Sequence, residues 1–220
     1  GIRFLLESSS GRVDLEMPSD AFRLSDNGIE FIDMASNRID TAKSRRFTQT
    51  MLRKGVRFPV GEVAGNPTAR KEYDEGYVLL DADRRLFHLK MVQGRPYVRA
   101  VELPEGVQPR HLFITEFRGR QTLALLTDEE HRLYAVTMPG YAVRPVGRVR
   151  FDPERESMTI IATLMNWTVG VEDGRTERLY AIAADDLSEL DSMSRSVEAG
   201  RMPGLSFTSR NDRYVKPRLQ

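Results

Sequence analysis

The chain has 220 residues, 40% of them hydrophobic and 30% charged, which suits one large globular domain or two small ones rather than a disordered tail. Its 33 basic and 32 acidic side chains give a formal net charge of +1, which excludes a global field for nucleic acid or anionic lipid. The absence of cysteine excludes disulfides, thiolate nucleophiles and cysteine-based metal sites.

The start of the chain predicts strands and then one helix. Residues 2–6 and 12–16 are predicted strands that complete the last unit of a closed ring. Because the chain begins with Gly1 rather than Met, and has no apolar run of the roughly 20 residues that cross a bilayer, we expect a targeting or anchoring segment to have been cut away. A helix is predicted at 40–54, with Asp40 as its N-cap and Gly55 as its C-cap.

Three later segments share one pattern, in which an apolar strand ends in an acidic turn and a second strand begins with leucine and an aromatic residue. They are residues 76–91, 123–138 and 167–183. Asp81, Asp128 and Asp173 follow one another at spacings of 47 and 45 residues. A weaker copy at 22–34 carries Asp26, which lies 55 residues before Asp81 because the helix is inserted between them.

A period of about 46 residues filled with short strands is the size of one four-stranded propeller blade. We therefore predict a single all-β, propeller-like domain over 1–220, with four to five blades and one inserted helix. The alternative is a β-sandwich with coincidental spacing. The predicted boundaries are repeats at about 20–76, 77–120, 121–166 and 167–215, outer fourth strands at 111–115 and 158–163, a second helix at 185–193, and loops at 60–74 and 199–209.

The repeated acids are candidate ligand-binding residues. In a closed ring, equivalent positions converge on one axis, so Asp26, Asp81, Asp128 and Asp173 could bind a hard cation or polarise a substrate. Each acid is equally explained as the cap of its own hairpin turn, and we expect capping.

Two aromatic residues are further candidates for contact with a ligand. Trp167, the single tryptophan, begins a strand and could stack on a sugar ring. Tyr77 begins the first strand of its repeat. A large apolar residue in a strand more often belongs to the core, and this is the alternative for both.

The sequence predicts no metal site and no cofactor. His88, His111 and His131 occupy different repeats at unlike positions, whereas metal ligands must converge. The motifs of a nucleophile elbow, a phosphate-binding loop and a zinc protease helix are all missing from the sequence.

Basic residues of the predicted helix are the best candidates for docking on a partner. Arg45, Arg46, Arg53 and Lys54 lie in one helix and suit an acidic protein or lipid headgroups. The other basic clusters have acids close by and lack the interleaved aromatic residues that stack on bases, so we expect no nucleic-acid partner.

Residues 17–26, 74–81, 86–90, 94–97 and 214–218 resemble an uncharacterised bacterial family of propeller-like domains of unknown function. That family is associated with membrane-anchored proteins encoded near ABC-transporter components. The resemblance brings no catalytic residues with it. It implies an extracytoplasmic domain beside membrane-spanning segments.

These patterns favour a non-catalytic, extracytoplasmic binding or scaffold module of a membrane-associated system, with a protein or membrane protein as its partner. Two alternatives remain. One is a propeller enzyme that acts on a carbohydrate or lactone through axial acids, and the other is a cytosolic scaffold for protein interactions. The identity of any small-molecule ligand is left open.

Overall fold

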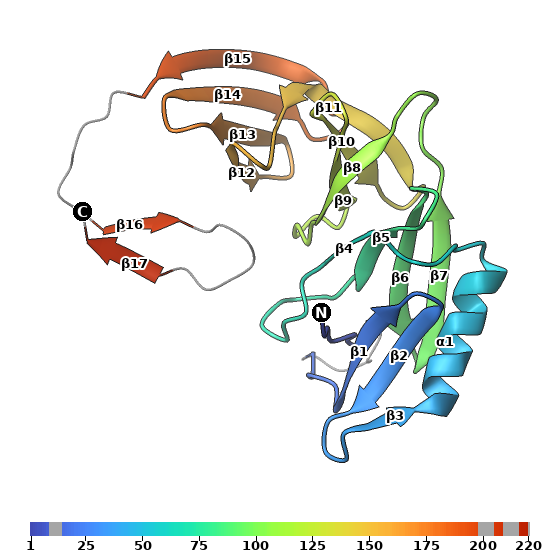
Figure 1. Cartoon of the computed structure of the whole chain (residues 1–220). Helices are drawn as coiled ribbons and strands as arrows, with labels where there is room; N and C mark the ends of the chain where they lie inside the picture. The colour runs from blue at the N-terminus through green and yellow to red at the C-terminus, as the bar shows by residue number, and fades with distance from the viewer. Residues whose placement is uncertain (9–14, 198–204, 209–215, 220) are drawn as a thin grey trace.

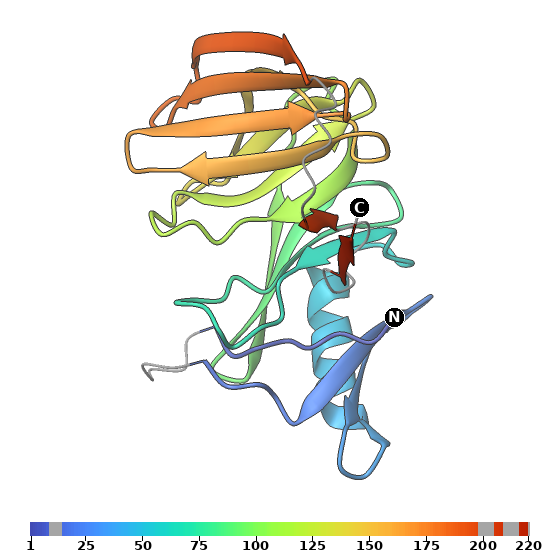
Figure 2. The same ribbon diagram turned by 90° about the vertical axis from the view of Figure 1, so that its left-hand side faces the viewer.

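The computed structural model describes residues 1–8, 15–197, 205–208 and 216–219. Their strands form five antiparallel sheets, and the three in the middle of the chain have four strands each. Figure 1 shows the sheets following one another along an arc, with one helix packed at its N-terminal end. The second view, in Figure 2, shows the fourth sheet stacked above the third.

The first sheet consists of β1 (Asp20–Ser25), β2 (Gly28–Asp33) and β3 (Arg38–Asp40). The second sheet consists of β4 (Glu62–Gly65), β5 (Tyr77–Leu80), β6 (Leu86–Val92) and β7 (Arg95–Val101). The third sheet consists of β8 (Pro109–Ile114), β9 (Thr122–Asp128), β10 (Arg132–Thr137) and β11 (Ala142–Arg150). The fourth sheet consists of β12 (Ser157–Ala162), β13 (Asn166–Glu172), β14 (Thr176–Ala183) and β15 (Glu189–Ser196). The last pair, β16 (Leu205–Thr208) and β17 (Lys216–Leu219), forms a separate hairpin.

Each four-stranded sheet is a simple up-and-down meander, and neighbouring sheets pack face to face. Three hydrophobic clusters fill the interfaces between the first and second, the second and third, and the third and fourth sheets. The first strands of adjacent sheets meet, because β4 contacts β8 and the backbone N–H of Leu112 donates to Glu62 Oε1 at 2.8 Å. Stacked four-stranded meanders of this kind confirm the predicted propeller-like, all-β fold.

Burial on two faces explains the composition of the central strands. In β5, Leu79 belongs to the cluster toward the first sheet, and its neighbours Val78 and Leu80 belong to the cluster toward the third. Because successive side chains point to opposite faces, a strand covered on both sides needs an unbroken apolar run. The fourth sheet differs, since Trp167 and Val169 of β13 are buried while Thr168 between them is exposed.

The predicted assignment of strands to units is shifted by one strand. The stretches at 111–115 and 158–163, predicted as outer fourth strands, fall in β8 and β12, which are the first strands of the next sheets. β4 also lies inside the predicted loop at 60–74. A sequence period is the same wherever counting begins, so the spacing alone could not show where one sheet ends.

The predicted helix is confirmed as α1 (Thr41–Arg53). The Asp40 side chain accepts a hydrogen bond from the backbone N–H of Lys43, as an N-cap does, and Lys54 is the C-cap. Gly55 follows with a φ of 92°, the left-handed conformation in which glycine ends a helix. Phe47 and Met51 are both fully buried against the first and second sheets.

Three expectations were wrong. Residues 185–193 form a turn and the start of β15 rather than a helix, and the backbone hydrogen bond from Leu187 to Ala183 closes that turn. Residues 2–6 do not complete the last sheet, because Arg3 pairs with Phe22 of β1 and so lies at the edge of the first sheet. Of the predicted loop at 199–209, residues 205–208 form β16. The other predicted N-terminal strand falls largely on 9–14, outside the described residues.

Candidate functional site

The acids at the turns of the second and third sheets are fully engaged in holding those turns. The side chain of Asp81 is completely buried and accepts hydrogen bonds from the backbone N–H groups of Arg57, Asp83 and Arg85. The Arg85 guanidinium lies 2.6 Å from its Oδ2. Burial alone would raise the pKa of the Asp81 carboxyl, but the hydrogen bonds from Arg85 and the backbone outweigh it and hold the pKa below its usual range.

Asp128 repeats this arrangement one sheet further on. Its carboxylate accepts from the backbone N–H groups of Glu130 and Arg132, and Arg132 Nε lies 2.7 Å from its Oδ2. Here too burial opposes ionisation, and the Arg132 hydrogen bonds outweigh it, so the pKa is lowered. Tyr134 donates to the same oxygen at 3.3 Å. Both carboxylates are therefore turn caps with neighbouring arginines as counter-ions, as predicted.

Asp173 caps its turn more simply, and Asp26 is exposed. Asp173 accepts from the backbone N–H groups of Thr176 and Arg175, both at 2.8 Å, and these bonds lower its pKa. Asp81, Asp128 and Asp173 all lie between the second and third strands of their sheets, in the middle of each sheet rather than at the first strand. Their equivalence therefore does not bring them to one axis. Within the described residues, no three acidic or histidine side chains come together as a metal site.

The two aromatic candidates belong to the core. Tyr77 is 3% exposed, and its hydroxyl donates to the carbonyl of Phe4 at 2.6 Å. Trp167 is 4% exposed and meets Phe117 edge to face, with ring centroids 5.4 Å apart. Neither ring is presented to a ligand in this structure, so their placement favours the core interpretation.

His88 is a buried polar residue between the second and third sheets. Its Nε2 lies 2.6 Å from the carbonyl oxygen of Glu75, and its Nδ1 lies 2.8 Å from the Tyr141 hydroxyl. Burial lowers the pKa of His88 to about 4. His111 and His131 lie elsewhere, 3.8 Å from Glu62 and 3.9 Å from Asp152. The three histidines are separate, as the sequence indicated.

The outer seam between the second and third sheets holds a hollow of about 510 Å³ next to Tyr141. Arg99 lies over the Tyr141 ring at 4.3 Å from its centroid. The remaining lining comes from the ends of β7 and β11 and the segment after β7, including Glu102, Leu103 and Val143. The hollow is open, and its charged side chains lie at its edge.

The four predicted docking residues lie on the solvent side of α1. Arg45, Arg46, Arg53 and Lys54 are all exposed, while the opposite side of the helix carries the buried Phe47. The helix contains no acidic residue. Two of the four make local contacts, since Arg46 donates to the carbonyl of Gly94 and Arg53 to the Thr50 hydroxyl. The structure thus presents these residues as one cationic surface, and their role in docking stays a prediction.

A second surface, which the sequence did not indicate, forms where the loops after the first strands come together. We call loops 66–76, 115–121 and 163–165 the mouth. The Asn66 side chain donates to Glu116 Oε2 at 2.8 Å, which joins the first two loops. A Cβ atom placed on Gly119 would lie 3.6 Å from Leu164 Cδ2, so the third loop touches the second.

Lys71 holds the base of the mouth. Its side chain is only 9% exposed, and its ammonium group contacts the carboxylates of Asp74, at 2.7 Å, and Glu116. Asp74 in turn accepts from the Ser8 hydroxyl at 3.0 Å and the backbone N–H of Gly76 at 2.9 Å. This buried ion cluster ties the N-terminal segment to both loops, so the base is ordered before any partner arrives.

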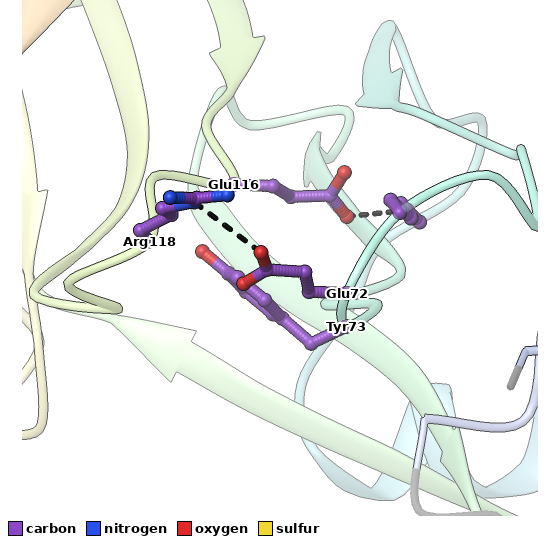
Figure 3. A pocket seen from close by; sticks show the side chains of 5 residues that line it. Glu72, Tyr73, Glu116 and Arg118 are labelled. Atoms are coloured by element: carbon purple, nitrogen blue, oxygen red, sulfur yellow. Dashed lines mark hydrogen bonds and ion pairs between the residues drawn. The ribbon is translucent and has the colours of Figure 1, made fainter. Parts of the chain in front are cut away.

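The rim of the mouth is charged and exposed (Figure 3). Glu72 and Arg118 point toward one another across a hollow of about 230 Å³ and form an ion pair at 3.3 Å. Their side chains are 62% and 90% exposed. Tyr73 lies beneath them and donates to the carbonyl of Phe117 at 2.7 Å, and burial raises its pKa to about 12.

Apolar side chains stand beside this rim. Leu164 and Met165, at the tip of the β12–β13 hairpin, are 77% and 80% exposed, more than any other large hydrophobic residue described. The Met165 carbonyl accepts from the backbone N–H of Ala184 at 3.0 Å, which fixes the tip. No motif signalled this surface, because its parts come from three loops far apart in the chain. The single hint was the run of mixed charge at 71–75, which resembles an ordinary solvated segment.

The stacked four-stranded meanders define a propeller-like β domain. The chain belongs to the family described as a domain of unknown function (DUF4857), whose model matches residues 1–182. The predicted membership of an uncharacterised, propeller-like family is therefore confirmed, while the link to membrane transport stays a prediction. The comparison with curated proteins gives no match.

Several solved structures are similar to the chain at low identity. The β-propeller domain of Cps50 (Swd1) from Myceliophteria thermophila is 13% identical, with a TM-score of 0.44 over 94% of this chain and 59% of that one. YCF48 from Cyanidioschyzon merolae is 8% identical, with a TM-score of 0.45 over 87% and 60%. PorZ from Porphyromonas gingivalis is 16% identical, with a TM-score of 0.36 over 88% and 21%. The chain thus spans three fifths or less of each of these structures.

In the part of the chain that the structure describes, no helix has the length and apolar character needed to cross a membrane.

Proposed function

We propose that the chain is a non-catalytic binding module that holds a protein partner at its mouth. The observation that carries the proposal is the pair Leu164 and Met165, which stand about four-fifths exposed at the tip of one hairpin. Single exposed apolar side chains are common on protein surfaces, but adjacent ones beside a charged rim are typical of interaction sites.

The shape of the mouth favours a macromolecule over a small ligand. Its hollow of about 230 Å³ is smaller than the roughly 300–1,000 Å³ of small-molecule sites. The buried Lys71 cluster keeps the base rigid, which lowers the entropy lost on binding. Leu164 and Met165 would then enter an apolar recess of the partner, and Glu72 and Arg118 would form the polar edge of the contact.

Site-specific photo-cross-linking tests this proposal in cells. A photoreactive residue is placed at position 165 in one protein and at position 26, an exposed turn of the first sheet, in another. We expect one defined protein to be cross-linked from position 165 and not from position 26. Adducts that are absent, or the same from both positions, would contradict a specific partner at the mouth.

We also propose that the module lies outside the cytoplasm as part of a membrane-associated system, in which an ABC-type transporter is the partner that the resemblance implies. The resemblance of residues 17–26 and 74–81 supports this placement. The cationic surface of α1 is consistent with it, because juxtamembrane basic residues attract anionic headgroups. Cell fractionation with a periplasmic and a cytosolic marker tests the compartment, and recovery with the cytosolic marker alone would contradict it.

Vesicle sedimentation tests the surface of α1 separately. We expect binding to phosphatidylcholine vesicles only when they contain phosphatidylglycerol, and a loss of at least about fivefold when Arg45, Arg53 and Lys54 are changed to Glu, since each basic residue near the surface contributes about 1 kcal/mol. A control with Arg144, Arg155 and Arg175 changed to Glu carries the same charge change at exposed sites away from the helix. Equal losses in both variants would contradict docking through α1, and an absence of vesicle binding would favour an acidic protein as the partner of this surface.

A further inference from the structure

The spacing of the first strands continues into the hairpin β16–β17. β4, β8 and β12 begin at residues 62, 109 and 157, which are 47 and 48 residues apart. β16 begins at residue 205, a further 48 residues along the chain. Its partner β17 pairs with it antiparallel, as β5, β9 and β13 pair with the first strands of their own sheets. The hairpin therefore stands where the first two strands of another unit are due.

The connections agree with this position. Seven residues lead from the last strand of the second sheet to β8, and six lead from the last strand of the third sheet to β12. Eight residues, 197–204, separate β15 from β16. In the two earlier cases a connection of this length carries the chain from the outer strand of one sheet to the inner strand of the next sheet in the stack.

The fourth sheet has a face for such a unit. The second and third sheets each contribute to two hydrophobic clusters, whereas the fourth sheet contributes to one. Its other face carries Ile161 and Met193, which are 64% and 56% exposed. Between them Leu179 lies over Gly170, whose Cβ position would be 3.3 Å from Leu179 Cδ2. This face is therefore apolar along β12 and β14 and has no cover among the described residues.

The hairpin has a matching pattern in its sequence and register. Leu205 pairs with Leu219 and Phe207 with Pro217, and the intervening positions pair serine with arginine and threonine with lysine. Alternate pairs of an antiparallel hairpin share a face, so its apolar pairs share one face. The equivalent strand β12 has the same alternation, with Ile160 packed toward the third sheet and Ile161 exposed on the other side.

We propose that β16 and β17 are the two inner strands of a fifth propeller unit and pack on the free face of the fourth sheet. This goes beyond the proposed function, because it assigns an occupant to a face that the mouth does not use. The existing interfaces indicate the contact. Phe113 of β8 and Ile160 of β12 pack in the same cluster between the third and fourth sheets. One repeat further on, the corresponding residues are Ile161 and Phe207.

The absence of natural cysteine makes disulfide trapping a clean test. Ile161→Cys and Phe207→Cys are combined in one protein, and Met34→Cys with Phe207→Cys in the control, since Met34 is an exposed residue of the first sheet. We expect an intramolecular disulfide in the first protein under mild oxidation, seen as a linked peptide by mass spectrometry, and little in the control. Equal linkage in both proteins would overturn the proposal, as would disulfides formed only between two copies, which would assign the face to a second copy of the chain.

A single-cysteine measurement covers the case in which the double variant does not fold. Ile161→Cys should react with a maleimide at least several-fold more slowly than Met34→Cys, although both positions are similarly exposed in the sheets themselves. Adding Phe207→Asp should restore the fast rate at position 161 and leave the rate at position 34 unchanged. Equal rates at positions 161 and 34, unaffected by Phe207→Asp, would overturn the proposal.

Discussion

The Tyr141 hydroxyl lies 2.8 Å from Nδ1 of His88, so a residue just before β11 completes the hydrogen bonding of a histidine in β6. The arrangement has one consistent set of donors. The Glu75 carbonyl can only accept, so Nε2 of His88 carries the proton and Nδ1 accepts from Tyr141. The Tyr141 oxygen is then free to accept from the Tyr97 hydroxyl, 3.1 Å away. The neutral imidazole is therefore the form that this interface holds.

Removal of the Tyr141 hydroxyl should destabilise the interface between the second and third sheets. In Tyr141→Phe, Nδ1 of the fully buried His88 loses its donor, and an unsatisfied buried polar atom costs about 1–3 kcal/mol of unfolding free energy. Urea denaturation at pH 7 measures the change. Tyr97→Phe is the matched control, because it removes a partly exposed hydroxyl and leaves the histidine satisfied. Equal losses in the two variants would contradict the account.

The same histidine should make stability depend on pH. Its pKa is about 4 in the folded chain and about 6.5 when unfolded, so the unfolded state binds more protons between these values. The stabilisation is complete above pH 6.5 and is lost as the pH falls toward 4, by about 3 kcal/mol in total. Unfolding free energies measured across this range should lose most of their slope in His88→Ala, in which the substituted residue matches Ala135 at the same place in the next sheet. A slope unchanged in that variant would contradict a buried, neutral His88.

The turn acids should contribute unequally to stability. Asp81→Ala removes an ionised, buried acceptor from three backbone N–H groups and should cost about 2–3 kcal/mol, since bonds to charged groups are worth about 1.5–3 kcal/mol. Asp173→Ala, at an exposed turn, should cost about 1 kcal/mol. Thermal unfolding gives both values, and calcium should change neither melting temperature. A calcium-dependent rise of several degrees that Asp81→Ala abolishes would instead support a cation site.

Two glycines at similar φ should tolerate alanine very differently. Gly76 has φ 64°, and a Cβ there would lie 2.4 Å from the Leu89 carbonyl oxygen, so the backbone must move. Gly94 has φ 68° and nothing within 4 Å of the Cβ position. Gly94→Ala should therefore cost only the left-handed conformation, about 1–2 kcal/mol, and Gly76→Ala clearly more. Similar unfolding free energies for the two variants would show that close approach is not what requires glycine at position 76.

The repeat and the helix could be predicted because each is encoded locally. Asp81 and Asp128 recur with their turns, and Asp40 and Gly55 bracket a helix whose apolar residues lie four apart. Such patterns depend on residues close together in the chain. The pairing of β8 with β9 rather than with β7 depends on which neighbour is nearer in space, and the spacing is silent on that.

The mouth could not be predicted for the same reason. Lys71 and Glu116 lie 45 residues apart in the chain, and their contact exists only because two loops follow equivalent strands of stacked sheets. Leu164 and Met165 resemble any apolar pair in the sequence, and only the structure shows that neither is buried. The converse holds for Trp167, where a general preference of large aromatic residues for the core led to the interpretation that the structure favours.

The affinity of the partner cross-linked from position 165 tests the central claim most directly. Leu164→Asp with Met165→Asp should weaken binding to that purified partner at least about tenfold, since losing anchors of this kind costs more than 1 kcal/mol and 1.4 kcal/mol is a factor of ten. Met34→Asp with Leu190→Asp, two exposed apolar residues away from the mouth, should change the affinity less than about twofold. Isothermal titration with the full chain gives both numbers. Unchanged affinity in the mouth variant, or an equal loss in the control, would contradict a binding module that works through this surface.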